Sequence, residues 1–328
     1  MRSMKYISLI IASLVIAISV DAQDLHFADV RQMGQWYNPA LKTDRQKDLR
    51  ANFRNINYQN MMAFKTGSAL VNIPLLGKEK ALAPSGASFF NVSGGAAFDQ
   101  SNTGFYKTTV GLLGLSYAKL LSNNNLYASV GFQGAFTNTK YGAEGLFPDQ
   151  MDANGPIPNS ISNDPLRAGR TFKYFGLNAG FSIFKNSNTA DWFFGVSVKE
   201  VNKPFTESTN SELFKLAPTW GLQAGAKLKG DQSNLDLTAA LNKKANASEY
   251  LVGAAYNFLF ASADPESGSE GSSIGLGCSY RVKDAYIPNI RLQFNKTYLG
   301  LYYDINISGI KLSSFNRRGF ELVLTQKF

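Results

Sequence analysis

Through most of the chain, apolar side chains alternate with small or polar ones in long segments that are separated by turn-forming residues. In 126–137, for example, Phe132 and Phe136 fall on one face, whereas Gln133 and Thr137 fall on the other. A period of two is typical of a β-strand, because successive side chains of a strand point to opposite faces. The sequence therefore predicts an all-β fold.

The length of these segments separates two all-β folds. They run for about 10 to 14 residues, whereas strands of globular proteins commonly have about 5 or 6. A tilted strand needs about 9 to 11 residues to cross a bilayer. Aromatic residues make up 13% of the chain and charged residues only 17%, against about 25% charged in soluble proteins. These features favour a transmembrane antiparallel β-barrel over a soluble sandwich, in which strands also alternate.

We expect about 14 strands, an even number, as in bacterial single-chain barrels. The expected strands are 49–59, 65–73, 86–98, 105–120, 125–140, 170–185, 191–202, 216–229, 233–243, 248–260, 271–283, 288–296, 298–307 and 318–328. The closing strand carries outward apolar residues and ends on an aromatic one, as is common in outer-membrane barrels; these residues are Phe320, Leu322, Leu324 and Phe328.

The expected connections differ in length at the two ends of the barrel. With the amino terminus in the periplasm, the short turns 121–124, 186–190 and 229–233 fall on the periplasmic side. The segments 141–169, 203–215 and 308–317 then become external loops. Two periplasmic connections, 74–85 and 261–271, are longer than that side usually has. Either they are contact loops or the strand count is wrong.

The amino terminus has the pattern of a secretory signal peptide. Arg2 and Lys5 precede an apolar run over 7–20, and small residues follow that run. The run is shorter than the roughly 20 residues of a membrane-spanning helix, which disfavours an amino-terminal anchor. We therefore expect an outer-membrane protein with three parts: a signal peptide at 1–22, a pre-barrel segment at 23–48 and the barrel at 49–328.

The pre-barrel segment contains the unusual stretch QWYNPAL at 35–41. Trp36 and Tyr37 are costly to leave in water, and Pro39 stiffens the chain by fixing its φ angle. We expect 24–41 to pack into the periplasmic mouth as a plug or docking element; the alternative is a disordered tail. The residues of this pre-barrel motif are His26, Phe27, Trp36, Tyr37, Asn38, Pro39 and Ala40.

Basic residues recur on the polar faces of three late segments; they are Lys227, Lys229, Arg281, Lys283 and Arg291. They could line an anion-selective pore or hold a plug that carries acidic residues. Alternatively, they lie near strand ends and simply meet water. The formal net charge of +9 does not decide between these alternatives, because basic residues also cap barrel rims.

Catalysis has little support in the sequence. The only histidine, His26, lies before the barrel, and the carboxylates are scattered. A nucleophile would lack a base, and the single Cys278 excludes an internal disulfide framework. We expect no catalytic residue, cofactor or metal site, and no nucleic-acid partner.

Four stretches resemble the PorP/SprF family of Bacteroidetes type IX secretion and gliding proteins. "AQDLHFADVRQMGQWYNPAL" resembles the family's mature start, where Asn38, Pro39 and Ala40 match the core of its motif. "LRANFRNINYQ" is similar to the first strand, and "FFGVSVKEVNKPF" to a mid-chain strand, although His is common where Glu200 stands. "LGLYYDINISGIKLSSFNRRGFELVLTQKF" resembles the family's last two strands.

This resemblance implies an integral outer-membrane barrel without enzymatic activity. Members work with the type IX machinery, some as partners of large secreted adhesin-type surface proteins whose export or attachment needs the barrel. Others associate with motor components in the periplasm. The sequence also leaves a second function open, a diffusion porin or transporter for small anionic solutes.

Overall fold

The computed structural model describes residues 26–58, 62–75, 87–101, 104–122, 124–142, 150–152, 155–157, 160–161, 170–205, 215–261, 271–307 and 317–328. The expected signal peptide at 1–22 lies outside these residues. Among the residues so described, no helix is long and apolar enough to cross a bilayer.

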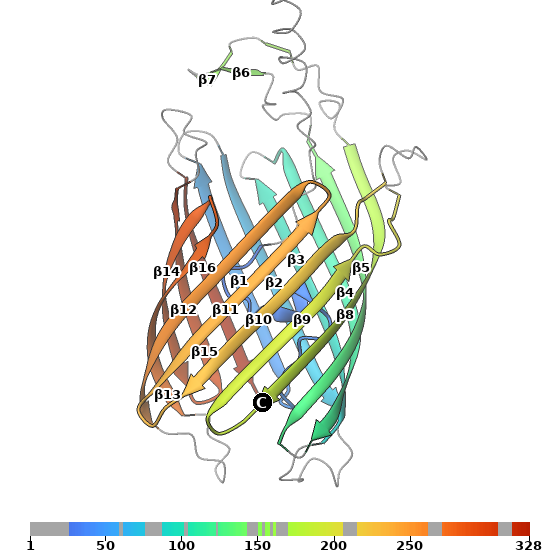
Figure 1. Cartoon of the computed structure of the whole chain (residues 1–328). Coiled ribbons are helices and arrows are strands. Elements are labelled where there is room, and N and C mark those ends of the chain that lie inside the picture. The colour runs from blue at the N-terminus through green and yellow to red at the C-terminus, as the bar shows by residue number, and fades with distance from the viewer. Residues whose placement is uncertain are drawn as a thin grey trace, which may run out of the picture.

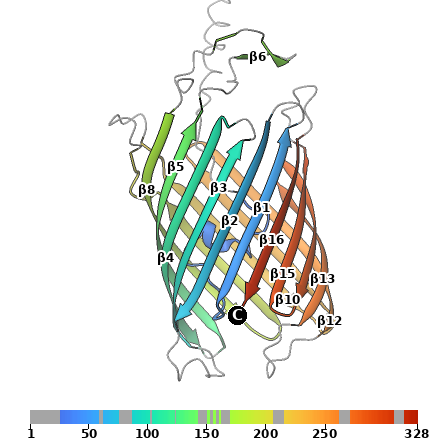
Figure 2. The same cartoon turned by 180° about the vertical axis from the view of Figure 1, so that it is seen from behind.

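Fourteen antiparallel strands form one closed barrel in which each strand pairs with its neighbours along the chain, and β1 pairs with β16 to close it (Figures 1 and 2). They are β1 (Asp48–Tyr58), β2 (Met62–Leu75), β3 (Phe89–Ser101), β4 (Tyr106–Ser122), β5 (Leu126–Tyr141), β8 (Arg170–Asn186), β9 (Ala190–Lys199), β10 (Thr219–Lys229), β11 (Ser233–Lys244), β12 (Ala247–Ala261), β13 (Ser272–Arg281), β14 (Ala285–Phe294), β15 (Thr297–Asn306) and β16 (Arg317–Lys327). A two-stranded hairpin, β6 (Met151–Asp152) and β7 (Gly155–Pro156), lies in the connection between β5 and β8. The predicted count of 14 strands is confirmed.

The two ends of the barrel differ in their connections. The start of β1 and the end of β16 lie at the lower end in Figure 1, which we call the terminal end; the opposite end is the loop end. The turns 123–125, 187–189 and 230–232 lie at the terminal end, as do the longer connections after β2 and β12. The predicted strand count is therefore correct on both sides of these two connections. The expected loops 141–169, 203–215 and 308–317 fall largely outside the described residues.

Several strand boundaries differ from the expected ones, and β9 and β14 are two examples. β9 ends at Lys199 instead of residue 202, because Glu200 has φ of 56° and leaves the extended conformation. β14 begins at Ala285 instead of residue 288, and its ladder to β15 is interrupted beside Pro288. Proline has no N–H to donate to a ladder.

The outer face of the barrel is apolar and its inner face is polar. On β5, Phe132 and Phe136 are exposed on the outside, whereas Ser129 and Gln133 are buried on the inside. Aromatic pairs lie on this surface near each end, with ring centroids 4.5 Å apart for Phe90 and Tyr117. Such a surface matches the lipid-facing band and aromatic girdles of outer-membrane barrels.

The outward residues of the closing strand continue this band. Phe320, Leu324 and Phe328 are exposed, and the Phe320 ring lies 6.0 Å from that of Phe53 across the β1–β16 seam. Leu322 is partly exposed on the same face. Lipid contact and cross-strand pairing on this face stabilise the seam together.

Candidate functional site: the luminal segment

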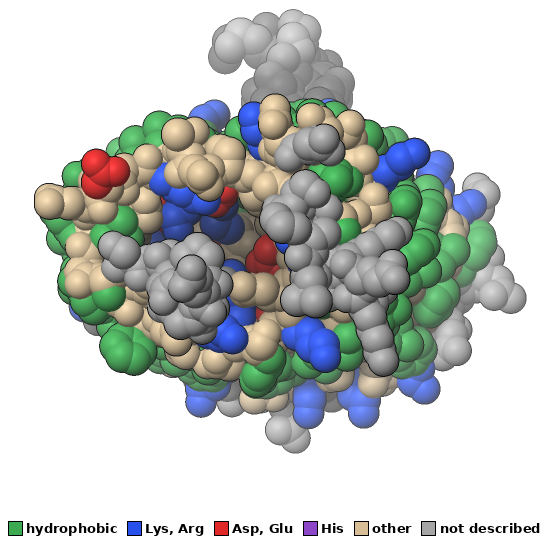
Figure 3. Space-filling model, turned by 90° about the horizontal axis from the view of Figure 1, so that it is seen from below, with side chains coloured by type: hydrophobic (Ala, Val, Ile, Leu, Met, Phe, Trp, Pro, Cys, Tyr) green, Lys and Arg blue, Asp and Glu red, His purple; other side chains and the backbone are tan. Residues whose placement is uncertain are grey.

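Residues 26–47, which we call the luminal segment, lie inside the barrel, where both side views show the short helix α2 (Gly34–Tyr37) between the walls (Figures 1 and 2). The segment's buried residues are Phe27, Ala28, Asp29, Val30, Met33, Gly34, Gln35, Trp36, Tyr37, Asn38, Pro39, Ala40, Leu41 and Lys42. Seen from the terminal end, the apolar wall surrounds a hollow in which basic and acidic side chains gather (Figure 3). The lumen of this barrel therefore holds a packed piece of its own chain.

An aromatic cluster forms the apolar centre of the luminal segment. The Phe27 ring lies 6.0 Å from both Trp36 and Tyr37. The Tyr37 hydroxyl donates to the Phe27 carbonyl at 2.8 Å and accepts from the Phe27 N–H at 2.9 Å, which closes the segment into a loop. Leu70 and Leu112 of the wall join the same cluster. Burying side chains of this size stabilises the packed state by about 1.5–3 kcal/mol each.

The Asn38 side chain fastens the segment to the wall at β8, β9 and β10. Its Nδ2 donates to the carbonyl oxygens of Phe181 and Val196 at 3.2 and 3.1 Å and to Gln223 Oε1 at 3.1 Å. Its Oδ1 accepts the Ala40 N–H at 2.9 Å, which fixes the turn through Pro39. One amide side chain thus bonds to three strands and to its own backbone.

Three glycines of the wall make room for the Asn-Pro turn. A Cβ atom at Gly180 would lie 1.9 Å from Asn38 Oδ1, and one at Gly195 would lie 2.7 Å from Asn38 Nδ2. At Gly131 it would lie 2.5 Å from the Pro39 carbonyl carbon. Any larger side chain would displace the turn, so we call these three glycines and their strands the glycine seat.

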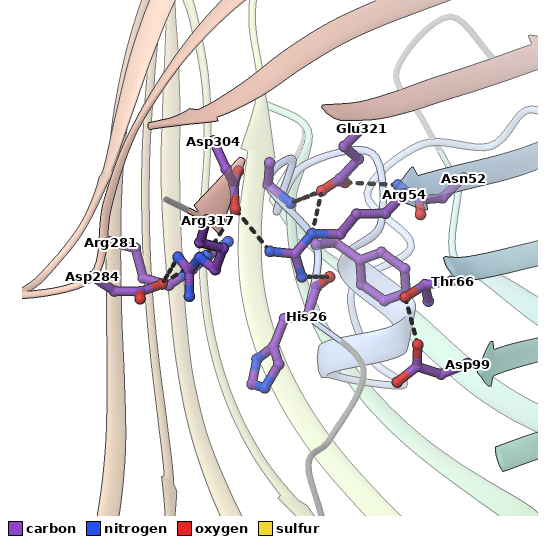
Figure 4. Close-up of polar contacts among 12 residues, drawn as sticks. His26, Asn52, Arg54, Thr66, Asp99, Arg281, Asp284, Asp304, Arg317 and Glu321 are labelled. Atoms are coloured by element: carbon purple, nitrogen blue, oxygen red, sulfur yellow. Dashed lines mark hydrogen bonds and ion pairs between the residues drawn. The ribbon is translucent and has the colours of Figure 1, made fainter. Parts of the chain in front are cut away.

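The start of the luminal segment meets a charged network on β1, β15 and β16 (Figure 4). The buried Glu321 accepts from the Ala28 N–H at 3.0 and 3.1 Å and from Asn52 Nδ2 at 2.7 Å. Arg54 donates to Asp304 at 2.9 Å and to the His26 carbonyl at 3.3 Å. These strands flank the β1–β16 seam, so the luminal segment bridges the seam from inside.

The network extends toward the loop end through Arg281. This guanidinium lies 3.2 Å from Asp304 and 3.0 Å from Asp284, and Asp284 also accepts from Arg317 at 2.8 Å (Figure 4). His26 adds a further contact, since its Nδ1 lies 2.5 Å from Glu249. Chained charge pairs of this kind fix one arrangement of buried groups, because a member left alone is costly.

Asp29 is an acidic group of the luminal segment that faces a basic residue of the wall. It accepts from the Tyr298 hydroxyl at 2.7 Å and from the Tyr302 hydroxyl. Burial alone would raise the pKa of Asp29, but the nearby Arg291 guanidinium and the two hydroxyls hold that pKa below its ordinary value. Asp29 is therefore charged at neutral pH and attracted to the Arg291 side of the lumen.

The structure separates the five predicted basic residues. Arg281 and Arg291 are buried in the lumen, and Lys229 lies 2.7 Å from Asp191 near the terminal end. Lys227 lies on the inner face of β10 opposite Asp236. Lys283 differs from the expectation: β13 ends at Arg281, and Lys283, with a φ of 61°, is exposed in the turn between β13 and β14.

Sequence reasoning missed the acidic partners and the glycine seat. Glu321 stands between two outward apolar residues of the closing strand, a position that places its carboxylate in the lumen. That alternation was a usable signal. The glycines, by contrast, match a turn that lies roughly 90 to 160 residues earlier in the chain, so no local pattern could have revealed them.

The fold and this site define an outer-membrane β-barrel whose lumen is occupied by its own amino-terminal segment. The family model described as "Type IX secretion system membrane protein PorP/SprF" matches residues 19–325. The chain therefore belongs to the PorP/SprF family, as its motifs had indicated. No curated protein matches it in sequence.

Several solved structures of barrel proteins are similar to this chain. The TodX deltaS2S3 mutant, a monoaromatic hydrocarbon channel, has 7% identity and a TM-score of 0.53, covering 88% of this chain and 92% of that one. The P. putida toluene transporter TodX has 9% identity and a TM-score of 0.46, covering 93% and 99%. The Ralstonia pickettii toluene transporter TbuX has 7% identity and a TM-score of 0.49, covering 89% and 92%. At such identities the mutant TodX match shows likeness of fold alone.

Proposed function

We propose that this outer-membrane barrel is a non-enzymatic part of the type IX secretion or gliding machinery. In this proposal it binds the C-terminal domain of a large secreted surface protein of the adhesin type, for its export or attachment. Its terminal end contacts periplasmic machinery. Membership of the type IX secretion family supports the setting.

The luminal segment is the observation that carries the proposal. A barrel whose lumen is filled by an aromatic cluster and crossed by buried charge pairs is built to stay closed. A rigid closed barrel suits a holder of another protein better than a conduit for solutes. In this proposal the partner binds at the loop end, where β5 and β8 and also β9 and β10 are joined by the longest connections of the sequence.

The test is recovery of the partner from the membrane. The barrel is extracted in mild detergent, and bound proteins are identified by mass spectrometry. We expect a very large secreted protein, and we expect its loss when 142–169 is replaced by a short Gly-Asn turn. Shortening 308–316 in the same way is the matched control for loop removal. Recovery that is unchanged by both deletions would contradict a partner site on the long loop.

A second function, diffusion of small anionic solutes, is favoured by one observation: basic side chains gather in the hollow at the terminal end (Figure 3). Planar-bilayer recording separates the two functions. We expect the intact protein to show no large steady single-channel current, because the luminal segment fills the lumen. Large, steady, anion-selective currents would instead establish the porin and overturn the closed holder.

A further inference from the structure

Four exposed lysines lie side by side on the outer face of the wall at the loop end. They are Lys65 on β2, Lys107 on β4, Lys140 on β5 and Lys173 on β8. Strand pairing places Lys107 directly opposite Lys140, and one strand, β3, separates Lys107 from Lys65. This part of the wall faces the viewer in Figure 2. We call these four residues the basic row.

The basic row has no acidic partner in the described part of the chain. No carboxylate there forms an ion pair with any of the four lysines. The acidic residues of the described strands at this end face the lumen, as Asp99, Glu249 and Asp304 do. Like charges directly opposite each other on a sheet are destabilising, and Lys107 faces Lys140 in this way. An anion from outside the chain would relieve this repulsion.

The basic row belongs to one side of the barrel. Within the described strands, the outer faces of β9 to β15 carry a single basic residue, Lys243 of β11. A rim that only meets lipid headgroups in general has no reason to concentrate its lysines on one side. Four lysines on five adjacent strands therefore indicate a specific surface for an anion.

Aromatic rings cover the outer wall next to the basic row, on the side of the bilayer centre. Phe98, Phe136 and Phe175 are exposed there, and Phe136 lies opposite Phe175 in the register. The Phe175 ring lies over Gly134 of β5, where an added Cβ would be 2.7 Å from it. The ring therefore lies along the wall, and these residues form an apolar surface beside the lysines.

A groove of about 640 Å³ opens in the outer wall beyond these rings. Its apolar lining consists of exposed side chains, namely Leu113, Leu115, Phe132, Leu177 and Val201. Gly134 lies between Leu113 and Leu177 in the register, so no side chain fills the floor of the groove there. A strand rises by about 3.3 Å per residue, which places Leu177 roughly 13 Å from Lys173 along β8. A groove at this depth of an outer-membrane barrel faces acyl chains.

The charge, the rings and the groove together fit one kind of molecule. We propose that this side of the barrel binds a lipid with a phosphomonoester headgroup. Its phosphate lies against the basic row, and an acyl chain runs over the rings into the groove. A phosphomonoester carries about 1.5 to 2 negative charges at neutral pH, which matches the facing pair of Lys107 and Lys140. This binding does not depend on the secreted partner proposed above.

Native mass spectrometry of the purified full chain in detergent tests the proposal. The probes are dioleoyl phosphatidic acid, dioleoyl phosphatidylcholine and glycerol 3-phosphate, which has the phosphomonoester but no acyl chain. We expect saturable binding of phosphatidic acid and at least tenfold weaker binding of the other two probes. Equal binding of phosphatidylcholine would show that the lysines do not select the charge, and equal binding of glycerol 3-phosphate would show that the groove is not used. Either result, or no binding of phosphatidic acid, would overturn the proposal.

Two double variants tie the binding to the basic row. Lys107→Met with Lys140→Met removes the two facing charges, so the affinity for phosphatidic acid should fall about tenfold or more. Lys119→Met with Lys243→Met is the matched control, because it removes two charges elsewhere on the outer face, at the terminal end of β4 and on β11. The control should bind like the unaltered protein. Unaltered affinity in the first double variant, or an equal fall in both, would overturn the proposal; heat-modifiable migration on gels checks that each variant is folded.

Discussion

The luminal segment is held in two different ways along its length. Its first part, 26–32, meets carboxylates and guanidinium groups near the β1–β16 seam. Its later part, 38–40, meets glycines of β5, β8 and β9, backbone carbonyls of β8 and β9, and the neutral Gln223 side chain of β10. The first contact depends on charge and the second on shape.

The two contacts differ in what they tolerate. A buried charge network is strongly destabilised when one member is removed, because the remaining groups are left without partners. A close-packed neutral contact is destabilised by added volume, since the wall cannot move away without breaking strand pairing. Substitutions that remove a group should therefore affect the seam side most, and substitutions that add atoms should affect the glycine seat most.

The largest loss of stability is expected from Glu321→Ala. This change leaves the Ala28 N–H and Asn52 Nδ2 without their acceptor, and loss of a buried charge partner typically costs about 3–5 kcal/mol. Urea unfolding of the barrel in lipid vesicles measures the loss. Glu321→Gln retains an acceptor oxygen and should lose clearly less. Equal losses in the two variants would show that the carboxylate charge, and not the acceptor position, is what matters at the seam.

Gly180→Ala should have the next largest effect and lower the free energy of unfolding by about 1–3 kcal/mol. The added Cβ would lie 1.9 Å from Asn38 Oδ1, so the Asn-Pro turn must leave its seat. Trypsin cleavage at Lys42 in the folded barrel reports that release. Gly111→Ala is the control, because a Cβ there meets nothing within 4 Å. Equal protection of Lys42 in both alanine variants would mean that the seat is not close-packed.

Asn38→Ala should lower the free energy of unfolding by about 1–2 kcal/mol. The change removes hydrogen bonds to the wall, each of which contributes only modestly to stability, and it adds no volume. The same urea titration measures it. Asn38→Ala in the Gly180→Ala background should recover part of the stability that Gly180→Ala loses, because the clashing oxygen is gone. Full additivity of the two losses would contradict direct contact between these positions.

Lys283→Ala should have the smallest effect, within about 0.5 kcal/mol, because this side chain is exposed in a turn. Arg281→Ala, two residues earlier, removes one of the two basic partners of both Asp284 and Asp304 and should destabilise the barrel clearly more than Lys283→Ala. If Arg281→Ala were as stable as Lys283→Ala, the charge network would not extend to the loop end.

The sequence predicted the barrel well because its signal is local. Alternation along each strand is required wherever one face meets lipid and the other the lumen, so the count of 14 strands could be obtained from periodicity alone. Strand ends were less predictable: β9 ends where Glu200 has a positive φ and its side chain lies beside Gly176 of β8, which no alternation encodes.

The site was predictable only in part for the same reason. Trp36 and Tyr37 stand out as apolar residues in a charged stretch, so their burial could be expected from the sequence. Their partners could not, because Asn38 bonds to residues 143, 158 and 185 positions away. Contacts at such separations leave no pattern in a single chain.

The position of the glycine seat has a consequence for the order of assembly. The luminal segment is synthesised before any strand, yet its receptor is made of β5, β8, β9 and β10, and its other anchor, Glu321, lies in the last strand. Contacts between residues so far apart in the chain form slowly, because closing the long intervening loop costs conformational entropy before the contacts can stabilise it. We therefore expect the amino-terminal segment to settle last, together with closure of the wall. A settled luminal segment would then mark a fully assembled barrel, and a protein that recognises this state would distinguish finished barrels from unfinished ones.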